Sequence, residues 1–138
     1  MKIRPYVSTD YQQLKVLYLD SSTFGGQFDE ARDGEERLQK KTEADPDAIL
    51  VAETDGQLIG TVSLIDDGRV AWLFRFAVRD RDKEVTKALH DEAVKLLKAR
   101  GHTQVLVYSP VGSSELDDRY QQLGFIKGDD YTCYWREI

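Results

Sequence analysis

Cysteine and histidine are scarce in this chain of 138 residues, which contains only Cys133, His90 and His102. A single cysteine excludes an internal disulfide and predicts a reducing compartment, the cytoplasm. No group of Cys and His residues has the spacing of a zinc site. We therefore expect a protein that holds no metal.

Long apolar runs and an excess of positive charge are also missing. Charged residues interrupt every apolar run well before the roughly 20 residues that a membrane-spanning helix needs. The formal net charge is −6, whereas binding to nucleic-acid phosphates requires clustered Lys and Arg. We expect neither a membrane nor a nucleic acid as partner, and the acidic balance fits small cationic partners better.

What is present is an ordinary globular composition. Hydrophobic residues make up 41% of the chain and charged residues 32%. This balance and length predict one ordered domain over residues 1–138 with a single core. No internal repeat or linker divides the sequence.

The first half of the chain predicts a strand and two helices before a run of strands. The segment KIRPYV (residues 2–7) is typical of an edge strand, and Ser8 or Thr9 is expected to cap a helix over residues 10–19. The pair Gly25-Gly26 indicates a loop, and residues 34–44 predict a second helix. Residues 48–78 then contain three β-rich runs separated by Asp-Gly pairs, which predicts an antiparallel meander.

The second half predicts two further helices and three strands. Residues 83–100 form an amphipathic pattern that Gly101 closes. The apolar run TQVLVYS (residues 103–109) predicts a strand parallel to its neighbour, and residues 114–123 predict a short helix. Two more strands are expected around GFIKG and DYTCYWREI. The predicted fold is therefore α/β, with a mixed sheet of about seven strands flanked by about four helices.

This element order, with three local segments, resembles the GNAT superfamily of acyl-CoA-dependent N-acyltransferases. The segments are WLFRFAV (residues 72–78), KALHDEAVKLLKARG (residues 87–101) and DRYQQLGF (residues 118–125). With the element order included, the resemblance spans nearly the whole chain. The resemblance implies acetyl-CoA as co-substrate, bound between the strand that ends in FAV and the following parallel strand. The backbone amides of Phe76, Ala77 and Val78 would then bond the cofactor and polarise the acetyl carbonyl.

The turn that binds the cofactor's pyrophosphate in this family departs from the usual pattern. Glu84 and Thr86 stand where the family has small residues, glycine above all, and the preceding loop is shorter. Glycine would let the backbone approach a phosphate closely. Two interpretations stay open: a self-capped helix start, or a phosphate cradle supported by cationic side chains. In the second, the resemblance implies cofactor contacts from Arg81, Lys83, Glu84, Val85, Thr86 and, further along the chain, Ser113, which is otherwise a helix N-cap.

Catalytic and acceptor residues follow from the same resemblance. Tyr120 matches the family tyrosine that protonates the departing CoA thiolate, a role suited to a phenol that is neutral at pH 7. The family's usual glutamate position holds Phe74, so Asp29, Glu30 or Asp66 would have to act as base through water. The expected acceptor pocket comprises residues 24–32, in particular Phe28 and Asp29, with Trp72, Phe74 and the aromatic residues Tyr131, Tyr134 and Trp135 of the final hairpin. Acidic and aromatic groups together favour an amine.

Two functions therefore compete. The first is an acetyl-CoA-dependent N-acetyltransferase, monomeric or homodimeric, that acts on a small amine. The second is an inactive GNAT-fold domain that binds a ligand or a protein and has lost CoA binding. The Tyr120 segment and the FAV strand favour the first, whereas the missing glycines and the missing base favour the second.

Overall fold

The computed structural model describes residues 1–20, 22–23 and 27–138. The chain forms two compact units, Met1–Val107 and Tyr108–Ile138. The expected Gly25-Gly26 loop and Phe24 of the acceptor pocket lie outside the described residues. Among the helices that are described, none has the length and apolar character needed to cross a membrane.

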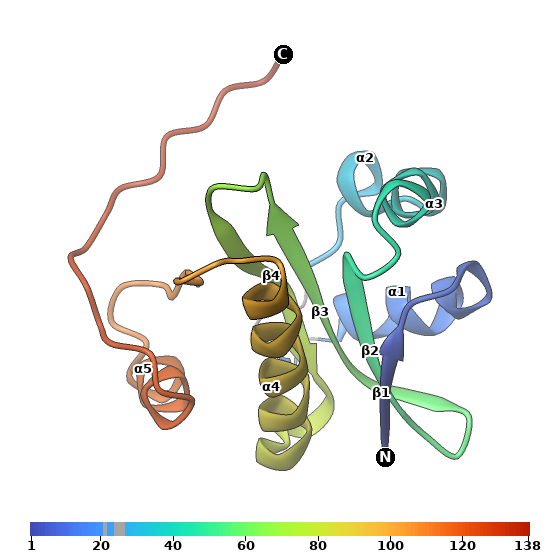
Figure 1. Ribbon diagram of the computed structural model, residues 1–138, viewed down its shortest axis with the longest axis horizontal. Helices are drawn as coiled ribbons and strands as arrows, with labels where there is room; N and C mark the ends of the chain where they lie inside the picture. Colours follow the sequence, from blue (N-terminus) through green and yellow to red (C-terminus); the bar gives the residue numbers. More distant parts are fainter. Residues whose placement is uncertain (21, 24–26) are drawn as a thin grey trace. The chain divides into compact units, whose positions relative to one another are not determined.

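A four-stranded antiparallel sheet forms the centre of the first unit (Figure 1). Its strands follow one another in chain order: β1 (Lys2–Pro5), β2 (Ile49–Thr54), β3 (Gln57–Asp66) and β4 (Ala71–Val78). The predicted meander over β2–β4 is confirmed. Asp55 and Gly56 both have positive φ angles in the first turn, and Gly68 has φ +84° in the second, a conformation that Gly, Asn and Asp tolerate best.

Helices cover both faces of this sheet. Helix α4 (Lys83–Ala99) crosses one face and α1 (Tyr11–Leu19) lies on the other (Figure 1). The short α2 (Glu30–Asp33) and α3 (Glu35–Ala44) follow α1 in the chain, and two 3₁₀ turns, Ser8–Asp10 and Arg79–Arg81, precede α1 and α4. The core on the α1 side includes Tyr6, Tyr11, Leu14, Leu17, Tyr18, Leu38, Ile49, Val51, Leu58 and Ala77.

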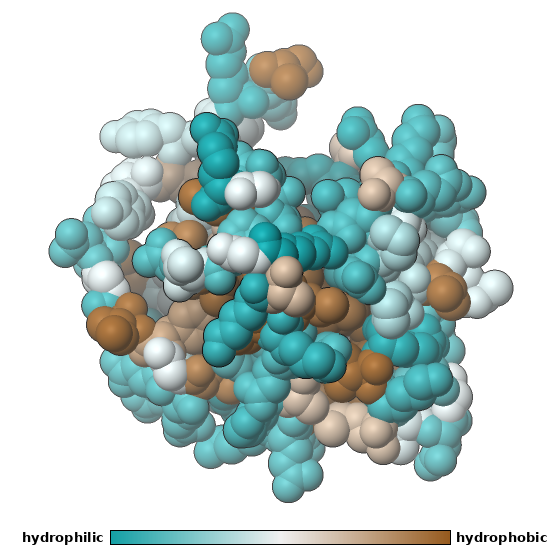
Figure 2. All heavy atoms as spheres, viewed as in Figure 1, coloured by the Kyte–Doolittle hydropathy of each residue, from teal (hydrophilic) through white to brown (hydrophobic). Residues whose placement is uncertain are grey.

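Helix α4 lies close to β3 because Gly60 has no side chain. A Cβ atom at Gly60 would lie 2.9 Å from methyl groups of both Leu89 and Val85, which is shorter than ordinary van der Waals contact. The opposite side of α4 is charged and exposed, with Lys87, Asp91 and Lys95. Figure 2 accordingly shows hydrophilic side chains over most of the face on which α4 lies. This division is the amphipathic pattern expected from the sequence.

The start of α1 differs from the prediction. Neither Ser8 nor Thr9 caps it; these residues form the 3₁₀ turn. Asp10 instead accepts a hydrogen bond from the Val7 amide at 2.9 Å and two from the Arg4 guanidinium at 2.7 and 2.9 Å. A carboxylate that pairs with arginine while it satisfies a backbone amide makes stronger, charge-assisted bonds than a hydroxyl would.

The second unit contains α5 (Ser114–Gln122) and the extended segment that follows it. Gly124 has φ +91° just after the helix, as expected for a C-terminal glycine. Asp117 accepts hydrogen bonds from Ser109 at 3.1 Å and from Lys127 at 2.8 Å. These contacts tie both flanks of the helix to its first turn.

The prediction of about seven strands in a mixed sheet is wrong for the described residues, which contain four antiparallel strands. The expected parallel strand over residues 103–109 is reduced to one bridge, between Trp72 and Leu106. The two final strands are extended segments without strand pairing, in which Ile126, Tyr134 and Trp135 are exposed. An apolar run favours a strand, but a strand also needs a neighbour to satisfy its backbone groups.

Candidate functional site

The candidate site begins where β4 parts from the segment that runs beside it. Leu73 donates its amide to the Leu106 carbonyl at 2.9 Å, and the Leu106 amide donates to the Ala71 carbonyl at 3.0 Å. Among the described residues, Leu73 is the last of β4 with a backbone hydrogen bond to residues 103–107. The remainder of β4 therefore runs on with an edge that this segment does not pair.

A β-bulge lies in the part of β4 that is not paired with residues 103–107. Ser63 pairs with Phe74 and Thr61 with Ala77, so that Arg75 and Phe76 both lie opposite Val62. Arg75 has φ +49°, a left-handed conformation that costs a non-glycine residue about 1 kcal/mol or more. Bulges bend a strand and redirect its groups, and they are frequent beside binding sites. Of the expected cofactor residues, Phe76 lies in the bulge and Ala77 and Val78 follow it; all three are buried.

The turn after β4 takes its tight conformation without glycine. Positive φ angles occur at Asp80 (+53°) and Arg81 (+54°), whereas Glu84 and Thr86, which replace the family's small residues, both lie within helix α4. The helical backbone at these two positions does not need glycine. Their side chains matter only as obstacles to a close approach by a ligand.

The first turn of α4 binds its own carboxylate. Asp82 is the N-cap, and its Oδ1 accepts hydrogen bonds from the amides of Glu84 at 2.8 Å and Val85 at 3.0 Å. Thr86 donates both its amide (3.0 Å) and its hydroxyl (2.6 Å) to the Asp82 carbonyl. These amides are the groups that an anion at a helix N-terminus would use. The geometry agrees with the self-capped interpretation of this turn.

The cationic side chains of the turn have different surroundings. Arg81 donates from Nε to the Ser22 carbonyl at 2.6 Å, which ties the turn to the segment after α1. Lys83 is exposed at the first position of α4. Val85 and Thr86 are buried, so a ligand could reach them only through their backbone.

On the α1 side, the expected acceptor residues have structural partners. Phe28 packs against the core, and the Lys15 ammonium lies 4.6 Å from the centre of its ring. Asp29 is the N-cap of α2, where it accepts from the Ala31 amide at 2.9 Å and pairs with Arg32. Trp72 and Phe74 are half-buried on β4. Asp29 therefore has a capping role, which the sequence analysis did not assign to it.

Two site residues that the sequence analysis did not single out connect these groups. The Arg75 guanidinium lies 4.7 Å above the Phe74 ring and forms an ion pair with Asp33, with side chains 6% and 3% exposed. Asp33 also accepts from the Asp29 amide at 2.9 Å. An arginine within the apolar run WLFRFAV was the available signal, because a buried charge is almost always paired.

Tyr120 and Ser113 belong to the second unit. Tyr120 lies on α5, and its ring contacts Phe125 edge-on with centroids 5.6 Å apart. Burial raises the pKa of Tyr120 to about 12. Ser113 is the N-cap residue of α5, although its side chain makes no capping hydrogen bond; its carbonyl accepts from the Asp117 amide at 3.0 Å.

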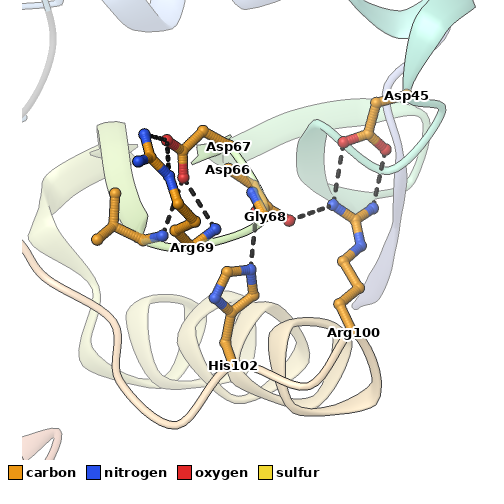
Figure 3. Close-up of polar contacts among 8 residues, drawn as sticks. Asp45, Asp66, Asp67, Gly68, Arg69, Arg100 and His102 are labelled. Carbon is orange, nitrogen blue, oxygen red and sulfur yellow. Dashed lines mark hydrogen bonds and ion pairs between the residues drawn. The ribbon is translucent and has the colours of Figure 1, made fainter.

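Asp66, considered above as a base, belongs to an ion-pair network at the other end of α4 (Figure 3). Its carboxylate accepts from the Gly68 amide at 2.8 Å and from Arg100 at 3.1 Å, and it lies 2.7 Å from His102 Nε2. Arg100 also binds Asp45 with two bonds of 2.8 and 3.0 Å. These contacts join the β3–β4 turn to the end of α4 and use Asp66 structurally.

The Asp66 network predicts a loss of stability in acid. The Gly68 amide lowers the pKa of Asp66; burial opposes this, and Arg100 and His102 reinforce it. A carboxyl whose folded pKa is depressed stabilises the protein above its unfolded pKa of about 3.9, and this contribution is lost as the pH falls through the folded pKa. We expect Asp66→Asn to destabilise the protein at pH 7 by on the order of 1 kcal/mol and to flatten the acid limb, measured by urea unfolding between pH 2 and 7. Asp55→Asn, in the exposed turn of the other hairpin, should change neither.

Comparison with known proteins gives the family. The sequence model of the acetyltransferase (GNAT) family matches residues 11–125. The chain therefore belongs to the GNAT family of acetyltransferases. An acetyltransferase of Photorhabdus laumondii is 26% identical over 133 residues, which covers 88% of this chain and 90% of that protein. The GNAT resemblance stated from the sequence is confirmed.

Solved structures show the same fold at lower identity. The PaiA N-acetyltransferase of Thermoplasma acidophilum, in complex with coenzyme A, is 24% identical with a TM-score of 0.79 over 94% of this chain and 92% of that one. Glucosamine-6-phosphate N-acetyltransferase of Arabidopsis thaliana is 18% identical, with a TM-score of 0.75 over 99% and 98%. The α/β GNAT-like fold is therefore confirmed, although the described sheet has fewer strands than predicted.

Proposed function

We propose that this protein is an acetyl-CoA-dependent N-acetyltransferase that acts on a small amine. The observation that carries the proposal is the parting of β4 from residues 103–107 after Leu73, next to the bulge at Arg75 and Phe76. A strand edge that runs on without a partner offers backbone groups to an extended ligand with amides of its own. Membership of the GNAT family supports the same conclusion.

The residues of this chain fit acetyl-CoA in one part of the site and oppose it in another. Backbone amides at Phe76, Ala77 and Val78 would hold the cofactor, and a bulged, apolar strand end suits its thioester arm. The amides of Glu84 and Val85 are already bonded to Asp82. A pyrophosphate would have to displace Asp82 or bind beside it, near Lys83. When bound, acetyl-CoA supplies the activated acyl group.

Each proposed residue has a physical task. The backbone of residues 76–78 would orient the acyl carbonyl and polarise it through amide dipoles that are already in place. Tyr120 would hold a proton for the leaving thiolate, and its raised pKa keeps it neutral over the physiological range. Phe28, Trp72 and Phe74 would supply aromatic surface for the amine, with Asp29 as a nearby negative charge.

The second function keeps the fold without the reaction: a GNAT domain that binds another ligand or a protein. The capping of α4 by Asp82 favours it, because this carboxylate occupies amides that an anion would need. Calorimetric titration with acetyl-CoA at low salt separates the two functions. Saturable micromolar binding supports the enzyme, and the absence of heat up to millimolar ligand would leave only the binding domain.

Substitution of Asp82 tests whether the amides at the start of α4 take part in binding. Asp82→Ala removes an N-cap, so we expect the free energy of unfolding to fall by about 1 kcal/mol. The same change frees the Glu84 and Val85 amides and removes a negative charge, so acetyl-CoA should bind several-fold more tightly. Thermal unfolding and calorimetry measure the two effects.

Asp82→Asn is the matched control, because it keeps a cap and removes the charge. It should retain most of the stability and change the affinity in the same direction but by less. If acetyl-CoA binds wild type and both variants equally, the amides of this turn are not part of the cofactor site.

A further inference from the structure

We propose that Arg75 is a positioning residue that fixes residues 27–33, which include Phe28 and Asp29 of the proposed acceptor pocket, against the bulge of β4. The proposal rests on the proposed function, because it gives that segment and that bulge their roles in one reaction. Arg75 would act through Asp33 and Gln27 and would not touch the reacting atoms.

The contacts of Arg75 converge on this segment. Its Nε donates to Asp33 Oδ1 at 3.1 Å and its Nη2 donates to Asp33 Oδ2 at 2.8 Å, a two-pronged pairing. The third nitrogen, Nη1, donates to Gln27 Oε1 at 3.0 Å. All three guanidinium nitrogens are therefore used on one segment, 42 and 48 residues away in the sequence. The planar guanidinium fixes direction as well as distance, which lysine could not do.

The other end of the connection is the bulge itself. Arg75 has φ +49° and shares with Phe76 the place opposite Val62. Its guanidinium lies above the ring of the preceding residue, Phe74. One residue thus supplies both the irregular backbone beside the proposed thioester site and the side chain that holds the proposed acceptor segment. A shift of either part is transmitted to the other.

The regular structure inside the segment is short. Helix α2 has only four residues, and a helix of this length does not persist by itself. Asp33 ends α2 and also accepts a hydrogen bond from the Asp29 amide, so the ion pair reaches the residue that caps the helix. When Asp33 is held, Asp29 and its neighbour Phe28 are held as well.

The energetics of buried ion pairs agree with positioning as the role. Desolvation of two charges offsets much of their attraction, so an apolar pair of similar volume is often equally stable. The Arg75 and Asp33 side chains are 6% and 3% exposed, which places the pair in this regime. Stability alone therefore does not account for the pair. Its directional, two-pronged hydrogen bonding is suited to aligning residues 27–33 with β4.

The test uses the double variant Arg75→Met/Asp33→Leu, which replaces the pair by apolar side chains. We expect its melting temperature to stay within a few degrees of wild type, while backbone amides of residues 27–33 exchange hydrogen at least tenfold faster. With acetyl-CoA and a panel of amines (a polyamine, an amino sugar phosphate, an aminoglycoside and a peptide with a free N-terminus), kcat/KM for the best acceptor should fall at least tenfold. The Kd of acetyl-CoA should change by less than twofold.

A second variant keeps the proposal testable if the double variant does not fold. Gln27→Ala removes only the hydrogen bond that Arg75 Nη1 donates to the exposed side chain of Gln27. This variant should raise the acceptor KM severalfold without a change in melting temperature. The proposal is overturned if the folded double variant keeps both wild-type exchange in residues 27–33 and wild-type kcat/KM, or if Gln27→Ala leaves the exchange and the KM unchanged. Should wild type bind no acetyl-CoA, the proposed function fails, and the exchange measurement still decides whether Arg75 holds this segment.

Discussion

Replacing Tyr120 by phenylalanine is expected to lower kcat for acetyl transfer by about 100-fold, within the range that general acid catalysis contributes. The substitution removes one hydroxyl and keeps the ring that contacts Phe125 edge-on at 5.6 Å. The Kd of acetyl-CoA, measured by calorimetry, should change by less than about twofold. A loss of turnover without a loss of affinity identifies a group that acts in the transition state.

The raised pKa of Tyr120 adds a pH dependence to this prediction. Burial raises that pKa to about 12, so the phenol keeps its proton through neutral and mildly alkaline pH. Ionisation of Tyr120 should therefore cause no fall in wild-type kcat below about pH 10. The low kcat of Tyr120→Phe should show no pH dependence from ionisation at this position. Because the pKa of Tyr120 is higher in the folded than in the unfolded protein, Tyr120 lowers the free energy of unfolding only when the pH rises above its unfolded pKa of about 10.

Tyr131→Phe is the matched control for the removal of a tyrosine hydroxyl from the second unit. Tyr131 is 81% exposed in the extended segment after α5. Its variant should keep the wild-type kcat and the wild-type Kd of acetyl-CoA. Because the sequence predicts Tyr131 in the acceptor pocket, an effect of this variant should appear only in the acceptor KM. If Tyr120→Phe instead loses turnover and cofactor affinity in equal measure, Tyr120 is a packing residue and the assignment of a proton donor fails.

Replacing Asp33 by alanine is expected to destabilise the protein by about 3–5 kcal/mol, because it leaves the Arg75 charge buried without its partner. A protein of this size is stable by about 5–15 kcal/mol in total, so the loss is a large fraction. The Asp33 carboxylate accepts from two Arg75 nitrogens and from the Asp29 amide, and all three donors would lose it. Urea unfolding followed by tryptophan fluorescence gives the free energy.

An exposed ion pair provides the comparison. Lys87 and Asp91 pair on the outer side of α4, with side chains 68% and 51% exposed. Asp91→Ala should cost only about 0.2–1 kcal/mol, as surface pairs do. A cost below about 1 kcal/mol for Asp33→Ala would mean that water or a rearrangement solvates Arg75, and the interpretation of a rigid, buried pair would then be wrong.

Much of the first unit could be predicted because its signals are local. Asp55-Gly56 and Asp67-Gly68 mark turns in which residues adopt positive φ, and the hairpins form there. The period of apolar residues in α4 and the closing Gly101, with φ +89°, likewise depend on neighbours only a few positions away. Local sterics and local hydrogen bonds decide such features.

The candidate site was only partly predictable. The resemblance pointed to β4 and to the turn before α4, where the structure shows the bulge and the Asp82 cap. Aspartate at a helix N-terminus is an ordinary cap, and the self-capped alternative was open from the sequence. The partner of Arg75 was not available, because Asp33 lies 42 residues away and resembles any other acid in a charged stretch.

The incorrect predictions concern strand pairing between segments that are distant in the sequence. Residues 103–109 form an apolar run and residues 125–138 contain two segments expected as strands, yet among the described residues the first makes one parallel bridge and the second no strand pairing. Local composition favours an extended strand, but it does not specify which backbone will accept the strand's hydrogen bonds. The number of strands was therefore overestimated.

The sequence by itself determined the family, the meander, the long helices and their turns, because these follow from periodicity, glycine placement and short motifs. Only the tertiary structure decided where β4 leaves its neighbour, which carboxylate fills the start of α4 and which acid neutralises Arg75. The physical reason is range: propensity and capping act within one or two turns of chain, whereas a buried charge or an open strand edge is defined by whatever the rest of the fold brings next to it.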